Sequence, residues 1–306
     1  FNKTQLPYRF VGGCVRESLA GRNIHDIDLA TTYTPEEVQE TLKEHAVKIV
    51  PTGLKHGTLT LVVDHHPFEI TTLRQDVDHD GRWAKIIYTT DWALDATRRD
   101  FTINAFSMCD NTVYDYVGGM ADLKARRVRF IGDPLARIHE DYLRILRYFR
   151  FLCDYHGAQH RASLKACLEL KTGLATLSGE RLFAELMRIM KKKDPLKVVR
   201  LMTKHKLVDP VFQNIPVGLS ARYFEKLLAV ESDFEGQGNQ ALRRLYAYLN
   251  PKSKIAATAI ADRLRMSRVD KNSFVTWQEA LSSRRAADLV VYHYLDQGGA
   301  DFALDF

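Results

Sequence analysis

The stretch that decides the fold is residues 8–31, YRFVGGCVRESLAGRNIHDIDLAT. It has the pattern of a strand Tyr8–Val11, a glycine pair that ends it, a helical segment Cys14–Ala20 and a second strand Ile27–Thr31. A glycine pair between a strand and a helix lets backbone N–H groups approach an anion, and the helix N-terminus adds partial positive charge. The stretch therefore predicts a strand, turn, helix and strand that together can hold a phosphate group.

Asp26 and Asp28 lie at the start of this second strand, on either side of Ile27. Alternate residues of a strand share a face, so both carboxylates are expected on one side while Ile27 points into the core. Such a pair can hold Mg²⁺, which prefers oxygen ligands and usually also binds phosphate oxygens of the substrate. Two such ions can stabilise the attacking oxygen and the leaving oxygen of an in-line displacement. An isolated Asp-x-Asp is more often an ordinary turn or edge-strand pair. Gly12–Gly13 and Arg16 add phosphate donors close by and favour the metal site.

The remaining elements indicate an α+β fold, in which an N-terminal head with a mixed β-sheet and flanking helices precedes an all-helical part. A helix is predicted to start at Thr34–Pro35, and long segments of helical periodicity begin near residue 133. The polar stretch Gln75–Trp83 predicts a surface loop. Further strands are predicted at Thr58–Val63, Phe68–Leu73, Ile103–Met108 and Val113–Tyr116.

Composition excludes several classes of protein. With 306 residues, 45% hydrophobic and 27% charged, the chain suits a folded globular protein rather than a disordered or fibrous one. No apolar run approaches the roughly 18 residues that cross a bilayer. No signal layout precedes residue 10, so a cytoplasmic or organelle-matrix location is expected, with no membrane partner. The four cysteines form no CxxC and indicate neither a zinc site nor a disulfide framework.

The net charge of +6 is unevenly distributed. Residues 1–130 contain 16 Lys and Arg against 18 Asp and Glu, whereas residues 131–306 contain 28 against 20. A basic run such as Lys191–Lys193 is usually just a solvated surface, but a basic helical part also suits a nucleic-acid backbone, which binds through sequence-independent phosphate contacts. We expect the protein to recognise RNA by its shape and by an accessible single-stranded 3′ end.

A further group of residues suits nucleotide recognition. Arg98 and Arg99 suit phosphate oxygens, and Asp100 and Asn104 could pair with ribose hydroxyls, although a surface salt-bridge cluster is an alternative. Glu69, on a neighbouring strand, could add a third carboxylate near the metals, or could instead pair with Arg74 or Lys85.

The segment Glu140–Phe151 is predicted to be one helix with Asp141, Arg144 and Arg147 on a shared face. An intrahelical ion pair is the simpler interpretation of Asp141 and Arg144. However, cytosine and adenine both present an amino donor beside a ring-nitrogen acceptor. An aspartate accepting from the amino group and an arginine donating to the ring nitrogen would accept C and A and reject U and G, at about 1 to 3 kcal/mol for each pair.

These motifs resemble a known family. Residues 11–32, VGGCVRESLAGRNIHDIDLATT, are similar to the signature of class II CCA-adding tRNA nucleotidyltransferases and bacterial poly(A) polymerases, within the DNA polymerase beta superfamily. The match departs at Glu17, where an aspartate usually follows the arginine, and at Ala20, where leucine is common. Four later segments resemble further motifs of the family in the expected order: Arg98–Ala105, Asp115–Leu123, Arg137–Arg147 and Ser178–Glu185.

The resemblance implies a nucleotidyltransferase head at residues 1–132, a nucleotide-selecting helical neck at 133–190 and a tRNA-binding helical body at 191–306. It implies template-independent addition of C and A to tRNA 3′ ends from CTP and ATP, with release of pyrophosphate and use of Mg²⁺. Asp26 and Asp28 would be catalytic and would bind the metal. The nucleotide-binding residues would be Gly12, Gly13, Arg16, Arg98, Arg99, Asp100, Asn104, Asp141, Arg144 and Arg147.

Alternatives to CCA addition stay open at the level of the sequence. Bacterial poly(A) polymerases share nearly all these motifs, but usually have longer basic C-terminal extensions and a PKDFD-like strand where this chain has IHDID. A CC-adding or A-adding enzyme is the next alternative, and a non-catalytic RNA-binding protein is a remote one. Residues 74–82 resemble the flexible loop that CCA-adding members use when switching from C to A. The expected partner is tRNA, through its 3′ end and acceptor arm; the sequence leaves the oligomeric state open.

Overall fold

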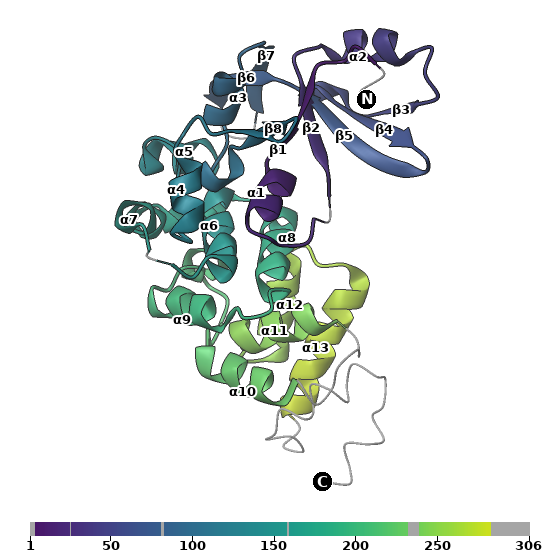
Figure 1. Cartoon of the computed structure of the whole chain (residues 1–306). Coiled ribbons are helices and arrows are strands. Elements are labelled where there is room, and N and C mark those ends of the chain that lie inside the picture. The colour runs from purple at the N-terminus through teal and green to yellow at the C-terminus, as the bar shows by residue number, and fades with distance from the viewer. Residues whose placement is uncertain (1–3, 25, 81–82, 158, 232–238, 283–306) are drawn as a thin grey trace. The chain divides into compact units, whose positions relative to one another are not determined.

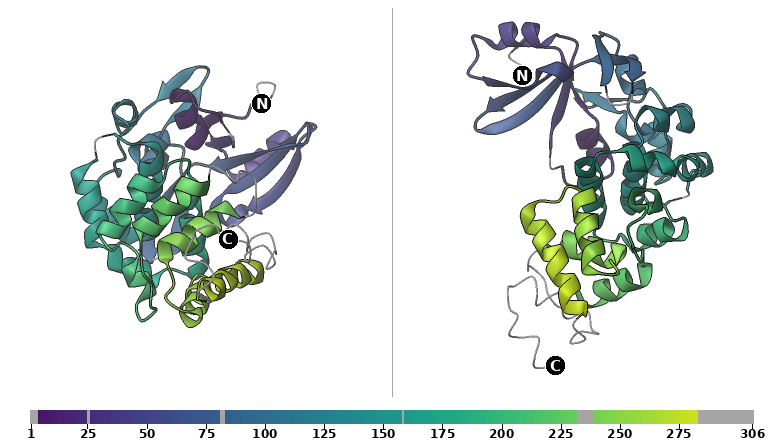
Figure 2. Two further views of the ribbon diagram at one scale, coloured as in Figure 1. Left: turned by 90° about the horizontal axis from the view of Figure 1, so that it is seen from below. Right: turned by 180° about the vertical axis from the view of Figure 1, so that it is seen from behind.

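The computed structural model describes residues 4–24, 26–80, 83–157, 159–231 and 239–282. The chain divides into two compact units, Phe1–Asp141 with His156–Leu164, and Tyr142–Tyr155 with Lys165–Phe306. The strands of the described residues all lie in the first unit, and the second unit is helical (Figures 1 and 2). The predicted α+β class, a mixed sheet followed by helices, is confirmed.

The first unit is built on a seven-stranded sheet of order β3-β4-β5-β2-β1-β8-β9. β2 and β5 run parallel, and the other neighbouring pairs are antiparallel. The β2–β5 register places Asp28 opposite Glu69 near the middle of the sheet. The strands are β1 (Tyr8–Val11), β2 (Asp28–Thr31), β3 (Lys48–Gly53), β4 (Thr58–Val63), β5 (His66–Thr72), β8 (Ser107–Cys109) and β9 (Thr112–Tyr114).

Local capping and packing position the helices of this unit. The Thr34 side chain accepts from the Glu37 backbone N–H while the Glu37 carboxylate accepts from the Thr34 N–H, a capping box that starts α2 at Pro35. Val38 and Leu42 of α2 pack in one cluster with Leu61 of the sheet, so α2 covers one sheet face. The helices are α1 (Gly13–Leu19), α2 (Pro35–Leu42), α3 (Trp92–Thr97), α4 (Gly119–Lys124) and α5 (Pro134–Glu140).

The second unit packs amphipathic helices around buried aromatic and aliphatic side chains. The Arg150 Nε donates to the buried Glu185 carboxylate at 2.5 Å, so α6 and α8 are joined by an ion pair. The helices are α6 (Leu143–Asp154), α8 (Gly179–Met190), α9 (Leu196–Lys204), α10 (Ala221–Glu231), α11 (Gln240–Leu249), α12 (Lys254–Arg263) and α13 (Arg268–Ser282). By its residue numbers α7 (Arg161–Glu169) belongs partly to each unit. Among the described residues, no helix has the length and apolarity to span a bilayer.

Two strand-and-loop predictions for the first unit are wrong. The stretch expected as a loop contributes to a hairpin of β6 (Arg74–Asp80) and β7 (Trp83–Tyr88), although residues 81–82 lie outside the described part. The two strands pair through backbone hydrogen bonds, which polar side chains do not prevent, so polar composition alone was a poor guide to a loop. The strand expected over Ile103–Met108 begins only at Ser107, because Thr102–Asn104 forms a 3₁₀ turn that directs Asn104 toward Asp100.

Two predictions about the placement of site residues are also wrong. β2 begins at Asp28, so Asp26 precedes the strand and the alternation argument does not apply to it. The helix predicted over Glu140–Phe151 is interrupted, because Asp141 is extended (φ −158°, ψ 105°) and α6 starts only at Leu143. Asp141 therefore does not share a helix face with Arg144 and Arg147.

Candidate active site

A carboxylate pair lies at the β2–β5 junction. Asp28 is in register with Glu69, and residues paired across neighbouring strands present their side chains on the same sheet face. Burial raises the pKa of Asp28, the charges of Glu69 and Asp26 raise it further, and the Arg99 charge acts in the opposite direction. Asp28 is thus within the field of two other carboxylates and one arginine, an arrangement that favours a cation at this position.

Two arginines converge on one buried aspartate beside this carboxylate pair. On α3, the Asp95 side chain is 5% exposed and accepts from Arg98 Nε at 2.7 Å and from Arg99 Nη2 at 3.2 Å. Burial alone would raise the pKa of Asp95, but the Arg99 and Arg98 charges and their hydrogen bonds lower it overall. Arg99 Nη1 also donates to the Asn104 carbonyl at 3.3 Å. Asp95 therefore fixes the direction of both guanidinium groups.

A hydrogen-bonded chain connects Arg16 to Asp100. The Asp100 Oδ1 accepts from the Phe101 N–H at 2.9 Å and from Asn104 Nδ2 at 2.8 Å, and Arg16 Nη1 donates to Asn104 Oδ1. Asp100 and Asn104 are each 7% exposed. The side-chain orientations of all three residues are thus coupled.

Glu17, the departure from the family signature, has a defined role in this chain. Its carboxylate accepts from Arg16 Nε at 2.8 Å and lies 3.7 Å from Arg22 Nη1. Glutamate therefore orients Arg16 at the position where the family signature usually has aspartate.

Gly12 closes the turn between β1 and α1 in a conformation that requires glycine. Its φ of 68° and ψ of −119° lie outside the regions of L-residues with a side chain. Its N–H donates to the Phe106 carbonyl at 3.0 Å. A Cβ added here would lie 2.8 Å from Arg99 Nη1. The glycine therefore allows Arg99 to lie directly against the turn.

Gly12→Ala is accordingly expected to have two effects. Backbone strain should lower the free energy of unfolding by about 1 to 3 kcal/mol. The displaced Arg99 should also raise the KM for a nucleoside triphosphate by about tenfold. Urea unfolding and initial-rate kinetics measure the two effects, with Gly21→Ala as the control. Gly21 also has a positive φ, but a Cβ there would meet nothing within 4 Å, so only the strain is expected. An unchanged KM in Gly12→Ala would contradict the placement of Arg99.

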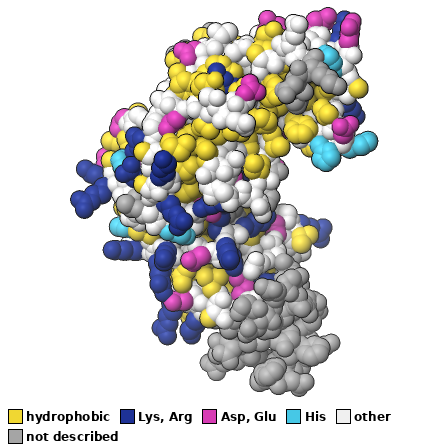
Figure 3. Space-filling view, in the orientation of Figure 1, with side chains coloured by type: hydrophobic (Ala, Val, Ile, Leu, Met, Phe, Trp, Pro, Cys, Tyr) yellow, Lys and Arg dark blue, Asp and Glu magenta, His cyan; other side chains and the backbone are white. Residues whose placement is uncertain are grey.

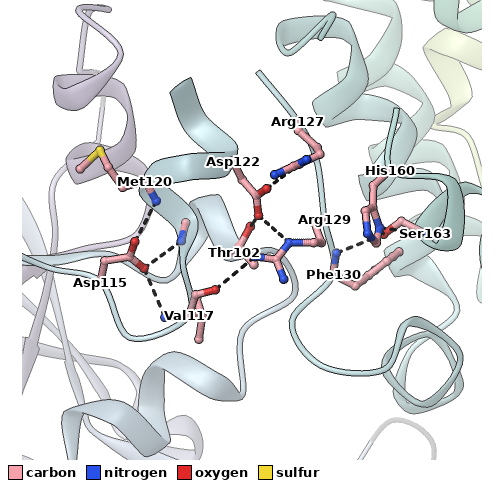
Figure 4. Close-up of polar contacts among 11 residues, drawn as sticks. Thr102, Asp115, Val117, Met120, Asp122, Arg127, Arg129, Phe130, His160 and Ser163 are labelled. Carbon is pink, nitrogen blue, oxygen red and sulfur yellow. Dashed lines mark hydrogen bonds and ion pairs between the residues drawn. The ribbon is translucent and has the colours of Figure 1, made fainter. Parts of the chain in front are cut away.

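A buried carboxylate braces the segment that follows Asp100 (Figure 4). Asp122, with a side chain 0% exposed, accepts from the Thr102 hydroxyl at 2.7 Å, from Arg129 Nε at 2.7 Å and from Arg127 Nε at 2.6 Å. Burial opposes ionisation, but the hydrogen bonds from Thr102, Arg129 and Arg127 lower the pKa of Asp122 overall. This network fixes Thr102, two residues after Asp100.

The start of α4 is part of the same brace. The Asp115 carboxylate accepts from the Gly119 and Met120 N–H groups, each at 2.8 Å (Figure 4). A Cβ on Gly119 would lie 2.3 Å from the Thr102 carbonyl oxygen, so only glycine permits this approach of α4. The segment Asp115–Leu123, one of those that resemble family motifs, is thus tied to Thr102 inside the first unit.

Comparison with known families matches two parts of the chain. Residues 8–129 match the family described as "Poly A polymerase head domain", and residues 160–217 match "Probable RNA and SrmB- binding site of polymerase A". The first match contains the carboxylates, the arginines and the Asp100 network. The chain belongs to the family of CCA-adding enzymes and poly(A) polymerases. The resemblance noted in the sequence is confirmed.

Members of this family from vertebrates are similar over much of the chain. The "CCA tRNA nucleotidyltransferase 1, mitochondrial" of Danio rerio is 47% identical over 195 residues, which are 62% of this chain and 45% of the relative. The mouse protein of the same name is 38% identical over 277 residues, which are 89% of this chain and 62% of the relative. The chain therefore spans less than two thirds of these relatives.

Solved structures of family members share the fold. The Bacillus stearothermophilus CCA-adding enzyme in complex with CTP has a TM-score of 0.73 at 24% identity, covering 95% of this chain and 70% of that chain. An apo CCA-adding enzyme has a TM-score of 0.75 at 23% identity, covering 97% and 76%. At these identities the likeness concerns the fold.

The expected site residues of this family member fall into two groups. The first unit brings together Asp26, Asp28, Gly12, Arg16 and the segment Arg98–Asn104. Gly13 begins α1, and its added Cβ would lie 3.8 Å from Arg16 Nη2. Arg144 and Arg147 lie one turn apart on α6, in the second unit, whereas Asp141 follows α5 in the first.

Sequence reasoning missed the residues that orient the candidate ligands. Asp95 was detectable, because it lies three and four residues before Arg98 and Arg99, the spacing of side chains on one helix face. Asp122 lies in the segment Asp115–Leu123, whose sequence resembles a family motif. Its role depends on Thr102 and Arg129, which reach it through the tertiary fold, and no local pattern reveals such contacts.

Proposed function

We propose that this chain carries the catalytic part of a CCA-adding tRNA nucleotidyltransferase. It adds C and A to tRNA 3′ ends without a template, from CTP and ATP, and releases pyrophosphate. The observation that carries the proposal is the convergence of Asp28 and Glu69 with Arg99 in one unit, because metal ligands and a phosphate donor must lie together in phosphoryl transfer. The names of the relatives support the tRNA substrate.

The donor set fits Mg²⁺. Asp26, Asp28 and Glu69 offer hard carboxylate oxygens. Burial raises the pKa of Asp28 most, and the Glu69 and Asp26 charges raise it further; a cation would offset that negative charge. In the described residues no three His, Cys, Asp or Glu side chains gather as a complete metal site. Mg²⁺ usually combines one or two carboxylates with substrate phosphates, so this pattern suits it. When bound, it would lower the pKa of the attacking 3′ hydroxyl and offset charge on the leaving pyrophosphate.

The chain's own residues orient the nucleotide. The backbone at Gly12 and Gly13, with Arg16, Arg98 and Arg99, binds the triphosphate. Asp95 keeps the guanidinium groups of Arg98 and Arg99 in place before the nucleotide binds. Binding therefore does not have to pay the entropy of ordering these two side chains. Asp100 and Asn104 contact the ribose, held by their mutual hydrogen bond.

Base selection is assigned to Asp141 and Arg144, with Arg147 as a further contact. Asp141 accepts from the amino group of cytosine or adenine, and Arg144 donates to the ring nitrogen. The two residues are three positions apart, so the chain keeps their Cα atoms within about 11 Å whatever the arrangement of the two units. The extended backbone at Asp141 gives its side chain a direction that a continuous helix would not.

The tRNA is assigned to the helical part. Lys and Arg side chains gather along one edge of the visible face, over the helices labelled α7 and α9 in Figure 1 (Figure 3). We assign residues 1–132 to catalysis, 133–190 to nucleotide selection and 191–306 to binding the acceptor arm. The protein acts in the cytoplasm or an organelle matrix; the names of the vertebrate relatives favour mitochondria.

A primer series tests this function. The chain is incubated with Mg²⁺, each nucleoside triphosphate separately, and tRNAs that lack CCA, end in C or end in CC. We expect C on the first two and A only on the third, followed by arrest. Long A tracts on unrelated RNA would identify a poly(A) polymerase instead. Addition of C alone or A alone would identify a CC-adding or A-adding enzyme.

A further inference from the structure

We propose that Arg137 is a positioning residue of the triphosphate site, which it serves by holding the main chain of Arg98 and Arg99. The proposal rests on the function proposed for those two arginines. Arg137 lies on α5, 39 residues after Arg98 and 38 after Arg99. Its hydrogen bonds to these two residues go to their backbone carbonyls.

The first support is the pair of carbonyls that Arg137 binds. Its Nη2 donates to the Arg98 carbonyl and, at 2.5 Å, to the Arg99 carbonyl. These peptide groups follow the last residue of α3, Thr97, where carbonyls run out of partners within the helix. The two N–H groups of one guanidinium nitrogen can reach two adjacent carbonyls, and a cation is favoured at a helix C-terminus. Arg137 therefore caps the C-terminus of α3 and fixes the positions of the Arg98 and Arg99 peptide groups.

The second support is the carboxylate that orients Arg137. Its Nη1 donates to both Glu140 oxygens at 2.7 Å, from one turn further along α5. The two side chains are only 13% and 19% exposed, so solvent screens this pair less than a surface pair. Glu140 thus holds one edge of the guanidinium while the other edge meets the carbonyls.

The third support is that the two arginines are fixed at both ends. Asp95 holds their guanidinium groups, and Arg137 holds their carbonyls. The next residue is held as well, because the Ile131 N–H donates to the Asp100 carbonyl at 3.1 Å. Without Arg137, Asp95 would still bind the guanidinium groups, but their peptides could shift. The triphosphate would then meet misplaced donors, and small misplacements are costly in reactions that depend on positioning.

Kinetics of the full chain test the proposal. The variants are Arg137→Met, Arg137→Lys and Glu140→Gln, with Arg126→Met as the matched control, because Arg126 is an exposed arginine of the same unit. For each protein we would measure kcat, the KM for CTP, the KM for a tRNA lacking CCA, and the inhibition constant of pyrophosphate against CTP.

We expect Arg137→Met to raise the KM for CTP and the inhibition constant of pyrophosphate together, by at least about tenfold, with an unchanged KM for tRNA. Glu140→Gln should shift both constants in the same direction by less. Arg137→Lys should lie between wild type and Arg137→Met, because an ammonium group can reach the carbonyls but cannot hold them on one edge and Glu140 on the other. Arg126→Met should match wild type.

A merely structural role predicts a different result. Partial unfolding would lower the active fraction and hence the apparent kcat, while the constants for CTP and pyrophosphate stayed at wild-type values; that result would overturn the proposal. If Arg137→Met fails to fold, the same comparison with Glu140→Gln decides.

The proposed function and this inference can fail separately. If wild type adds neither C nor A to tRNA, the function fails, but calorimetric titration of wild type and Arg137→Met with pyrophosphate still tests the inference. Weaker binding by the variant supports it. Equal binding overturns it, even if wild type adds CCA.

Discussion

Asp28→Asn is expected to reduce nucleotide incorporation by at least about a thousandfold and, at the same time, to raise the melting temperature. The loss of activity follows because an amide cannot replace the carboxylate as a ligand for Mg²⁺, which supplies several kcal/mol of transition-state stabilisation. The gain in stability follows because burial and the nearby Glu69 and Asp26 charges raise the pKa of Asp28. At neutral pH the folded protein therefore carries an ionised group that its surroundings disfavour, and its removal should raise the melting temperature measurably.

The pH dependence of this stability gain tests separately whether Asp28→Asn stabilises the protein. A raised pKa means that folding favours the protonated carboxyl, so the stabilising preference is present at low pH and is lost as pH rises through the folded pKa. The advantage of Asp28→Asn should therefore be largest near neutral pH and vanish below about pH 4, the ordinary range of an aspartate. Melting curves without added metal measure this trend.

Controls separate the two effects of Asp28→Asn. Added Mg²⁺ with CTP should raise the melting temperature of wild type by more than that of the variant, which keeps the arginines but lacks one metal ligand. Asp64→Asn changes an exposed aspartate in the turn between β4 and β5 and should leave activity and stability unchanged. Asp26→Asn should also abolish incorporation. Substantial turnover by Asp28→Asn would refute the metal site.

Asp122→Ala is expected to lower the free energy of unfolding by about 2 to 4 kcal/mol. Removing one partner of a buried ion pair typically costs 3 to 5 kcal/mol, and Arg127 and Arg129 are 36% and 33% exposed, so solvent recovers part of that cost. The Thr102 hydroxyl also loses its acceptor. Urea unfolding followed by circular dichroism measures the change.

A graded series tests the origin of this loss. Asp122→Asn keeps the shape and loses the charge, so its effect should be intermediate. Arg127→Met leaves the carboxylate with Arg129 and Thr102 and should cost about 1 kcal/mol. Because the pKa of Asp122 is lowered, its stabilisation exists above the unfolded pKa and fades as pH falls through the folded value. The difference between wild type and Asp122→Asn should therefore shrink on acidification, opposite to the trend at Asp28. A loss below about 1 kcal/mol in Asp122→Ala would contradict the bracing role.

The sequence predicted what depends on short-range patterns. The order from Tyr8 to Thr31 was predictable, because glycines and apolar runs mark the ends of these elements locally. The break at Asp141 was not, since Ile138 and Ile145 are seven residues apart and keep the same helical phase on either side of one extended residue. In the hairpin of β6 and β7, polar composition suggested a loop, yet Asp80–Gly81 is a pair of turn formers often found between strands.

The contacts that complete the candidate site needed the fold. Glu69 became a neighbour of Asp28 only through the parallel pairing of β2 with β5, which a chain segment of some 40 residues separates in sequence. The same holds for Arg137 and Arg99. Sequence spacing identifies ligands that share a turn, but tertiary pairing decides which of them meet.

The single aspartate between two arginines also determines which anions this unit can retain. Asp95 neutralises one of two positive charges, so a net charge of about one remains for incoming groups. A monovalent ion such as chloride gains little there and must compete with a carboxylate that is already hydrogen-bonded. A polyanion with oxygens spaced along a chain can contact both guanidinium groups at once and gains far more. If Arg98 and Arg99 bind the triphosphate as proposed, Asp95 keeps them ordered in salt and still leaves one net positive charge for the nucleotide.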